Sequence, residues 1–251
     1  MKKLIPFILL LLSISHIAFA QLKLYVYENN GETTEFIASN VDSIAFTAPG
    51  TYPVDPNSDD YIEEFIDLGL SVRWASCNIG ANRPERYGDY FAWGETSIKS
   101  NYNISNYIWF DIDSGTIIKY CTDEGVGTLD YNIILDVSDD AARVNWGNGW
   151  RIPTMEEFNE LIDNCDINWT KLNNVGGCKF TSKINGKSIF LPASGYMASS
   201  DSSVGELGYY WTATLDVKDP SRAMQFMFNY KEHQLNSTAR FFGQPIRPVI
   251  P

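Results

Sequence analysis

The chain has 251 residues, among them 19 basic and 31 acidic side chains, which gives a formal charge of −12. Nucleic-acid binding depends on Lys and Arg contacts to phosphate, and the sequence contains no basic stripe, so this class of function is excluded. After residue 20 no apolar run approaches the roughly 20 residues that a membrane-spanning helix requires, so no membrane span is expected.

Residues 1–20 have the pattern of a secretory signal peptide. Lys2 and Lys3 precede an apolar run over 4–14, and residues 18–20 (AFA) form a small-x-small cleavage site. We therefore expect a cleaved chain in the periplasm, on the cell surface or outside the cell. Removing two lysines leaves 17 basic and 31 acidic residues, a formal charge of 17 − 31 = −14, which favours solubility.

Residues 21–48 are predicted to form a small β unit. Apolar and polar residues alternate over 22–27, the sequence NNG at 29–31 favours a turn, and a second strand follows over 33–37. A third short strand is predicted over 43–46. Three prolines and a polar run then predict an extended linker over 49–60, before a main domain over 61–251.

The first elements of the main domain are a strand over 70–74 and two helices. Ser138 is the predicted N-cap of the first helix, with Asp139 and Asp140 in its first turn. Thr154 and Glu157 form a capping box at the start of the second helix. The residues at 158, 161, 162 and 165 (F, L, I, C) then lie on one apolar face of that helix.

Short β-like runs follow the second helix. Residues 179–183 and 188–191 flank the hairpin sequence NG at 185–186, and further strands are predicted over 209–215 and 223–230. The last run, 246–250, is expected to lie beside the first strand of the domain. These patterns predict an α+β domain with two helices, many short antiparallel strands and long loops.

The chain has four cysteines that could form disulfides or bind a metal ion: Cys77, Cys121, Cys165 and Cys178. An even count in an exported chain favours disulfides, and of the three ways to pair four cysteines we favour the local pair Cys165–Cys178. Zinc is not expected, because there is no C-x-x-C pair and His233 is the only histidine after the signal. His233 is predicted to lie in an exposed loop, away from any nucleophile.

Six segments of the main domain carry a resemblance to a known family. They are 67–75 (DLGLSVRWA), 87–96 (YGDYFAWGET), 146–154 (WGNGWRIPT), 191–196 (LPASGY), 210–212 (YWT) and 243–249 (GQPIRPV). Over roughly residues 65–251 the chain resembles the Fibrobacter succinogenes major paralogous domain, which is common in exported proteins of the Bacteroidetes. The resemblance implies a fold similar to the C-type-lectin-like and sulfatase-modifying-factor (formylglycine-generating-enzyme) group. It implies no activity, because the family has none established.

Composition favours a non-enzymatic binding module for a glycan or a cell-envelope protein. The chain has 14 Tyr and 7 Trp, and such side chains give rigid amphipathic contact area. Our candidate ligand-binding residues are Tyr102, Tyr107 and Trp109, in the loop-like stretch 101–110, with Tyr90 and Trp93. The alternative is a structural component of a cell-surface or adhesin assembly without a small ligand.

Other conspicuous residues of the motifs are predicted to be structural. The core is expected to contain Trp74, Trp146, Trp150 and Trp211. Arg151 and Arg247 lie in apolar surroundings, and we expect buried arginines paired with an acid or with backbone carbonyls.

Two less favoured hypotheses are a calcium-dependent lectin and a formylglycine-generating-type enzyme. Asp111 and Asp113 are weak candidate calcium ligands, because a third acidic position is missing. Residues 244–246 (QPI) match part of a C-type-lectin sugar-binding triplet, but Ile246 stands where an acid is expected. The enzyme family uses a cysteine pair near the C-terminal end of the domain, and no cysteine follows Cys178. No cofactor is predicted, with structural calcium left as an alternative.

Overall fold

The computed structural model describes residues 23–27, 33–37, 64–147, 149–198 and 201–251. Contacts along the chain divide it into two units, Met1–Pro53 and Val54–Pro251. In the first unit, β1 (Lys23–Tyr27) pairs antiparallel with β2 (Thr33–Ile37), which confirms the predicted hairpin. The predicted signal segment, the third strand over 43–46 and the linker over 49–60 lie outside the described residues.

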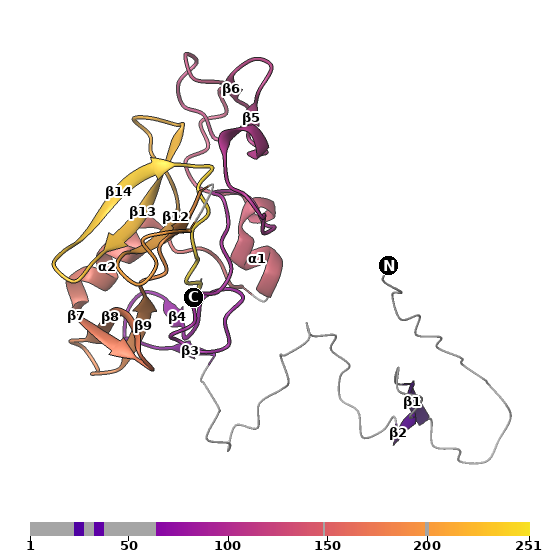
Figure 1. Cartoon of the computed structure of the whole chain (residues 1–251), viewed down its shortest axis with the longest axis vertical. Helices are drawn as coiled ribbons and strands as arrows, with labels where there is room; N and C mark the ends of the chain where they lie inside the picture. The colour runs from indigo at the N-terminus through magenta and orange to yellow at the C-terminus, as the bar shows by residue number, and fades with distance from the viewer. Residues whose placement is uncertain (1–22, 28–32, 38–63, 148, 199–200) are drawn as a thin grey trace, which may run out of the picture. The chain divides into compact units, whose positions relative to one another are not determined.

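The second unit combines few helices with many short antiparallel strands, so the predicted α+β class is confirmed (Figure 1). Among the described residues, three sheets have three strands each. The first has the order β15 (Val249–Ile250), β4 (Arg73–Ala75), β3 (Phe65–Ile66), and the second has the order β7 (Cys165–Leu172), β8 (Val175–Ser182), β9 (Ser188–Pro192). The third has the order β12 (Gly208–Leu215), β13 (Arg222–Phe228), β14 (His233–Ala239). The two α-helices of the described residues are α1 (Ala141–Trp146) and α2 (Met155–Asn164). The short elements are β3 (Phe65–Ile66), η2 (Ile104–Asn106), β5 (Phe110–Asp111), β6 (Thr116–Ile117), η3 (Val137–Asp139), β10 (Tyr196–Met197) and β11 (Asp201–Ser202).

The two ends of the second unit lie side by side, as predicted. β4 (Arg73–Ala75) pairs antiparallel with β15 (Val249–Ile250), with Trp74 opposite Val249. The strand predicted over 70–74 was wrong in its start, because residues 70–72 form bends and the strand begins at Arg73. The backbone of Arg151 joins the same edge through an isolated bridge to Val249. Motifs that lie far apart in the sequence therefore meet at one small sheet.

Helix α2 begins as the sequence predicts. Thr154 is its N-cap, its hydroxyl accepts from the amide of Glu157, and the Glu157 carboxylate accepts from the amide of Thr154 at 2.8 Å. Phe158 and Leu161 on its apolar face are fully buried. The helix contacts β7, β12 and β13 and thus closes one side of the core.

The predicted cap of the first helix is wrong by two residues. Ser138 lies in the 3₁₀ turn η3, and the N-cap of α1 is Asp140. Its carboxylate accepts from the amides of Ala142 and Arg143 at 2.9 and 3.0 Å, and from the amide of Ile152 at 2.9 Å. One carboxylate oxygen therefore caps the helix while the other binds the amide of Ile152, and a serine has only one side-chain oxygen.

The predicted hairpin around 185–186 is confirmed, and two edge strands escaped prediction. β8 (Val175–Ser182) pairs with β9 (Ser188–Pro192), and β12 (Gly208–Leu215) pairs with β13 (Arg222–Phe228). The longest missed strands are β7 (Cys165–Leu172) and β14 (His233–Ala239), each at the edge of its sheet. Both expose many polar side chains, so they lack the apolar alternation typical of a strand. The two-residue strands β3, β5, β6, β10 and β11 were not predicted either. His233 is exposed as predicted but begins β14, so its assignment to a loop was wrong.

Two main hydrophobic clusters form the core on opposite faces of the β12-β13-β14 sheet. Tyr210, Phe226 and Phe228 face the first cluster, together with Trp74 and α2. Trp211 and Ala223 face the second cluster. The predictions of core positions for Trp74, Trp150 and Trp211 are confirmed, and Trp146 is half-buried with its ring edge on Trp150 at 5.1 Å.

Arg247 is a fully buried cation held by neutral acceptors. Its guanidinium donates to the side chain of Asn78 at 2.8 Å and to the carbonyls of Ala75, Ser76 and Phe190 at 3.1, 2.9 and 2.9 Å. The prediction of a buried arginine on backbone carbonyls is confirmed here. Arg151 is only half-buried, and it pairs with Glu157 at 2.7 Å.

The predicted disulfide between Cys165 and Cys178 is absent, because all four cysteines are free and buried. Along the β7–β8 ladder Cys165 lies opposite Ser182, whereas Cys178 lies opposite Trp169. The two cysteines are thus four ladder positions apart, about 13 Å at roughly 3.3 Å per residue. A disulfide needs Cα atoms within about 7 Å.

We predict that replacing Arg247 destabilises the domain far more than replacing a half-exposed arginine. Arg247→Met orphans four buried acceptors, and each typically costs about 1–3 kcal/mol, so we expect a loss of about 4 kcal/mol or more in chemical denaturation. The matched control is Arg151→Met, whose partly exposed ion pair contributes about 1 kcal/mol. Equal losses in the two variants would contradict the assignment.

We also predict four unreactive thiols in the native protein. Burial raises the pKa of Cys165 to about 11 and that of Cys178 to about 12, so neither forms the reactive thiolate at pH 8. Thiol titration is expected to find four groups only after denaturation without reductant. A count of two, with a disulfide-linked peptide by mass spectrometry, would contradict the structure.

Candidate functional site

The aromatic residues predicted to bind ligand from the 101–110 stretch point inward. Tyr102 and Tyr107 are buried, and the phenol of Tyr107 donates to the carbonyl of Trp93 at 2.7 Å. The phenol of Tyr102 donates to the carbonyl of Tyr90 and accepts from the amide of Lys99. These two rings fasten the stretch to the domain, and Tyr107 also lines a cavity described below. Contact of either ring with a ligand stays a prediction.

Trp93, Trp109 and Tyr90 also make structural contacts. Trp93 is buried and its indole donates to the carbonyl of Thr212 at 2.8 Å. Trp109 is half-buried, and its indole donates to the carbonyl of Gly94 at 2.8 Å. The half-buried Tyr90 donates to the carbonyl of Ser194 at 2.6 Å. The structure therefore does not bring the five predicted aromatics together on an exposed face.

Asp111 is the last residue of β5, and Asp113 lies in the turn between β5 and β6. The Asp111 carboxylate accepts from the Ser114 hydroxyl at 2.9 Å and from the amide of Asp113 at 3.0 Å. These hydrogen bonds, that of Ser114 foremost, lower the pKa of Asp111. Within the described ranges no three His, Cys, Asp or Glu side chains are grouped closely enough to hold a metal ion.

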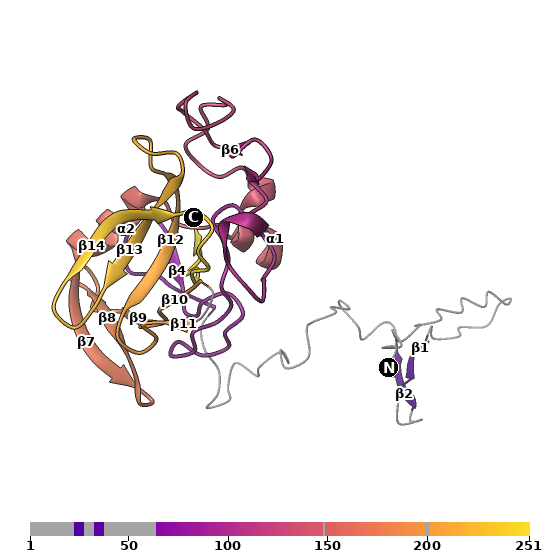
Figure 2. The ribbon, with the colours of Figure 1, turned by 45° about the horizontal axis from the view of Figure 1, so that its top comes forward.

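Residues 103–137, here called the excursion, project from the body of the domain and carry β5 and β6 (Figures 1 and 2). Arg240, a fully buried residue just after β14, fastens the excursion at its base. Its guanidinium donates to the Tyr107 hydroxyl at 2.9 Å and to the carbonyls of Lys119, Tyr120 and Pro220 at 3.0, 3.2 and 2.9 Å.

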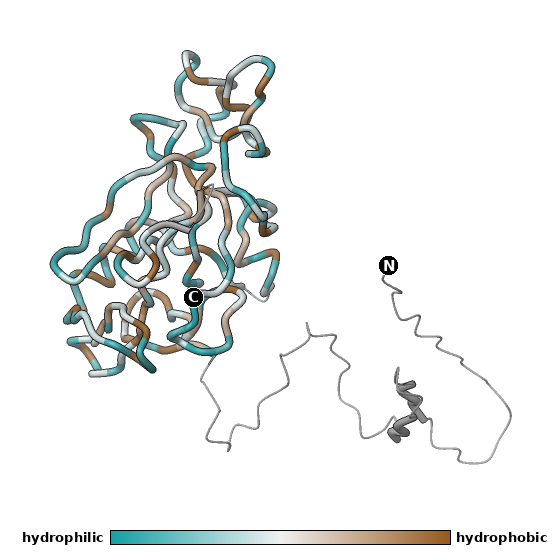
Figure 3. Tube along the Cα trace, in the orientation of Figure 1, coloured by the Kyte–Doolittle hydropathy of each residue, from teal (hydrophilic) through white to brown (hydrophobic). Residues whose placement is uncertain are grey.

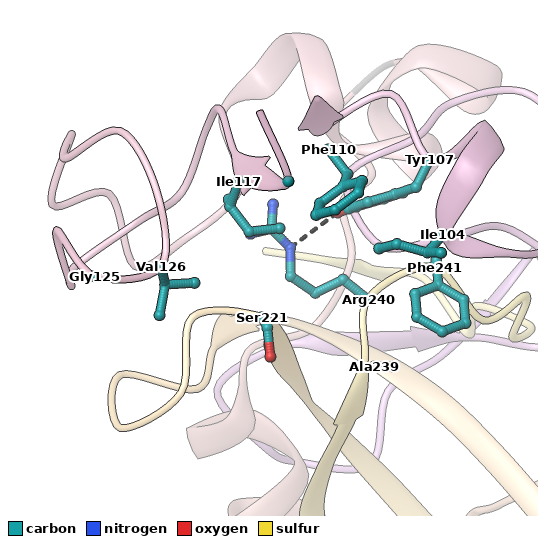
Figure 4. A pocket seen from close by; sticks show the side chains of 11 residues that line it. Ile104, Tyr107, Phe110, Ile117, Gly125, Val126, Ser221, Ala239, Arg240 and Phe241 are labelled. Carbon is teal, nitrogen blue, oxygen red and sulfur yellow. Dashed lines mark hydrogen bonds between the residues drawn. The ribbon is translucent and has the colours of Figure 1, made fainter. Parts of the chain in front are cut away.

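A cavity of about 440 Å³ lies beside Arg240, between the excursion and the end of β14 (Figure 4). Its walls are mainly apolar and include Ile104, Phe110, Ile117, Val126 and Phe241. Four of the five guanidinium N–H groups of Arg240 are already used by the hydrogen bonds above. This cavity therefore suits an apolar group more than an anion.

A second cavity, of about 230 Å³, lies on the face of the β12-β13-β14 sheet that is opposite the first core cluster. We call it the aromatic–amide cavity. It is lined by Tyr196, Tyr209, Gln225, Met227, Asn236, Thr238, Phe242 and Gln244.

Strand alternation places the floor of this cavity. Tyr209 lies opposite Met227, and Gln225 lies opposite Trp211 on β12 and Asn236 on β14. Because successive side chains of a strand point to opposite faces, Tyr209, Gln225 and Met227 share the face that Trp211 occupies. Trp211 enters the second core cluster, and the cavity begins where that cluster ends.

Two crossing segments supply the aromatic wall. Met197 and Gly243 exchange backbone hydrogen bonds at 2.7 and 2.9 Å, which places Tyr196 beside Phe242. The ring centroids of Tyr196 and Phe242 are 5.2 Å apart, and Tyr196 meets the Tyr209 ring edge-on at 5.4 Å. A side chain at 243 would meet the ring of Tyr102 at 2.9 Å, so only glycine allows this crossing.

A chain of three amide side chains crosses the cavity. Gln244 donates to Gln225 at 2.6 Å, and Gln225 donates to Asn236 at 2.7 Å. Gln244 is 1% exposed, and its Oε1 is buried without a hydrogen-bond partner. At the other end, the Asn236 amide nitrogen and the Thr238 hydroxyl make no side-chain hydrogen bond within the described residues.

The aromatic–amide cavity is electrically neutral. Its lining contains no acidic or basic side chain. Burial raises the pKa of the Tyr209 phenol, and the neighbouring Tyr196 adds to this effect, so Tyr209 is uncharged at neutral pH. The arrangement can therefore contact a neutral ligand through ring faces, an amide donor, a hydroxyl and a buried acceptor.

Sequence reasoning missed this cavity because its polar residues lie where the pattern is weak. Asn236 and Thr238 belong to β14, the missed edge strand. Gln244 lies outside any strand, and the sequence suggested a ligand role for it only within the triplet QPI. One sequence signal could have found the cavity. Gln225 and Met227 alternate with Phe226 and Phe228 along β13, so the strand has a second face opposite its phenylalanine face.

Comparisons with known proteins leave the family open. No protein-family model, no curated protein and no solved structure matches the chain. The resemblance to the Fibrobacter succinogenes major paralogous domain therefore stays a prediction. Among the described residues, no helix is long and apolar enough to cross a membrane.

We predict that Trp109→Ala destabilises the protein, because the indole packs against Tyr120 and bonds to Gly94. Large-to-small changes at buried aromatic positions typically cost about 3–5 kcal/mol, so we expect about 3 kcal/mol for this half-buried ring. Ile112→Ala, at a residue 61% exposed on the same excursion, is expected to change stability by less than about 0.5 kcal/mol. An unaltered unfolding midpoint in Trp109→Ala would return Trp109 to the ligand candidates.

Proposed function

We propose that this protein is an exported, non-enzymatic binding module that recognises a neutral glycan at the aromatic–amide cavity. We also propose that its main domain is a Fibrobacter succinogenes major paralogous domain with a lectin-like fold. The observation that carries the functional proposal is the conjunction of Tyr196, Tyr209 and Phe242 with the amide chain that ends in the unpaired Gln244 oxygen.

The chemistry of this lining matches a sugar better than other small ligands. A pyranose has an apolar C–H face that stacks on aromatic rings and hydroxyl groups that donate and accept hydrogen bonds. The cavity offers both kinds of contact with few convergent polar groups, as ligand sites usually do. Its neutrality disfavours phosphate and carboxylate ligands, because no cation is present to offset their desolvation.

A catalytic role has little support in the groups present. His233 borders the same shallow groove as Cys165 and Asp166. A nucleophilic cysteine needs a lowered pKa, but burial raises the pKa of Cys165 to about 11. The lining of the aromatic–amide cavity contains neither a histidine nor a carboxylate. We therefore propose binding without chemical conversion and without a cofactor.

A protein partner is the second candidate, and a specific observation favours it. The excursion exposes many large apolar side chains, which appear as hydrophobic stretches in Figure 3. They are Ile104, Ile108, Ile112, Ile118, Leu129, Tyr131, Ile133, Ile134 and Val137. The 103–137 segment also has six acids and one base. Such a surface would suit a basic component of a cell-surface assembly, with the cavity of Figure 4 accepting an apolar side chain.

A glycan-array screen of the purified protein, with and without calcium, tests the proposal. We expect selective binding that chelator does not abolish, because the aromatic–amide cavity needs no metal. Tyr209→Ala is expected to weaken binding at least about tenfold, since stacking of this kind is worth roughly 1–3 kcal/mol. Tyr230→Ala, at an exposed tyrosine outside the cavity, is the matched control and should bind normally.

Two other results have clear meanings. Binding that disappears with chelator would contradict the metal-free site and revive the calcium-lectin hypothesis with Asp111 and Asp113. A clean negative from folded protein would contradict glycan recognition and favour a protein partner at the excursion.

A further inference from the structure

We infer that the aromatic–amide cavity receives the acetamido group of an N-acetylated sugar, an inference that rests on the glycan-binding function proposed above. An acetamido group combines one N–H donor, one carbonyl acceptor and one methyl group. The cavity offers a counterpart to each of the three.

The buried acceptor is the first counterpart. The backbone of Gln244 is paired with Phe91 by two hydrogen bonds of 2.9 Å, and its side-chain nitrogen is bound to Gln225. Oε1 of Gln244 therefore cannot turn to a new protein donor without breaking the amide chain. An orphaned buried acceptor typically costs about 1–3 kcal/mol, which an incoming N–H removes.

The donor at the outer end is the second counterpart. The amide nitrogen of Asn236 is left over because its oxygen accepts from Gln225. A chain of amides has a donor at one end and an acceptor at the other, whichever way its members are turned. A secondary amide also has one donor and one acceptor, so in either orientation of the chain it can pair with the end that it meets.

The aromatic wall is the third counterpart. Tyr196, Phe242 and Tyr209 surround the amide chain with ring surface, and Met227 adds an adaptable thioether. The volume of about 230 Å³ equals roughly eight water molecules at about 30 Å³ each. This is room for one substituent and part of a ring, so the remainder of a glycan would extend outside.

The absence of charged side chains from the cavity lining disfavours a sugar with a free amino group. Glucosamine carries an ammonium group at neutral pH, and no carboxylate lines the cavity to pair with it. Burying that charge unpaired is unfavourable. The acetylated sugar is therefore favoured over both the amine and the parent sugar that has a hydroxyl at the same carbon.

Isothermal titration of the purified protein with methyl glycosides tests the inference. We expect the glycosides of N-acetylglucosamine or N-acetylgalactosamine to bind at least about tenfold more tightly than the glucoside, the galactoside and glucosamine. Nε-acetyl-lysine is included to separate a sugar from an acetylated protein as the source of the acetamido group, and it is expected to bind more weakly than the sugar.

Two variants locate the effect. Gln244→Met removes the buried oxygen with little change of volume, and Asn236→Leu removes the outer donor, so either is expected to abolish the acetamido preference. Asn168→Met, at an exposed amide on β7, is the matched control and should preserve it. Thermal melting of each variant establishes whether the fold is retained. If Gln244→Met does not fold, Asn236→Leu alone tests the inference.

Several results would overturn the inference. Equal binding of acetylated and non-acetylated sugars would refute the acetamido assignment and leave glycan recognition standing. A preference that survives in both folded variants would place the acetamido group elsewhere. Acetyl-lysine binding as tightly as the sugar would assign the site to acetylated protein. Binding of none of these probes by a folded protein that binds another sugar on the glycan array would refute the acetamido assignment alone. No binding in either experiment would contradict the proposed function as well.

Discussion

The buried guanidinium of Arg247 is the interaction on which the rest of the domain depends. It joins the 75–78 segment, the middle of β9 and the C-terminal segment through four hydrogen bonds, and no acid takes part in them. Backbone carbonyls cannot be buried unless they find donors. An arginine supplies five donors from one side chain, so a single residue allows three separate segments to meet beside the paired terminal strands.

Arg240 solves the same problem for the excursion. It binds carbonyls of Lys119 and Tyr120 and the hydroxyl of Tyr107, and it lies over the ring of Trp93 at 4.8 Å. The aromatic side chains at the base of the excursion therefore hold this long segment against the domain. The rings left for a ligand are those of Tyr196, Tyr209 and Phe242, in a cavity whose lining has no charged side chain.

Individual residues show which features of the fold and of the candidate site can be predicted from the sequence. The capping box formed by Thr154 and Glu157 was predictable, because cap chemistry acts locally. The alternation before Trp74 located β4 but not its start, since residues 70–72 bend before the strand begins. The cap at Asp140 was missed because its third partner, the amide of Ile152, is a tertiary contact. The prediction of a Cys165–Cys178 disulfide was wrong because the spacing of two cysteines in the sequence does not determine the register of the β-ladder that carries them. The direction in which Trp109 points, and hence the candidate site, depends on tertiary packing in the same way.

The central claim is that the aromatic–amide cavity recognises a neutral sugar through its acetamido group. Saturation-transfer NMR on the intact protein with methyl N-acetylglucosaminide and its galactosamine counterpart tests it most directly, because it reports which ligand protons lie against the protein. We predict that the acetamido methyl protons receive the strongest saturation, since Tyr196, Tyr209 and Phe242 surround them, and that Gln244→Met removes the effect. Saturation confined to ring protons, or none with either sugar, would contradict the account.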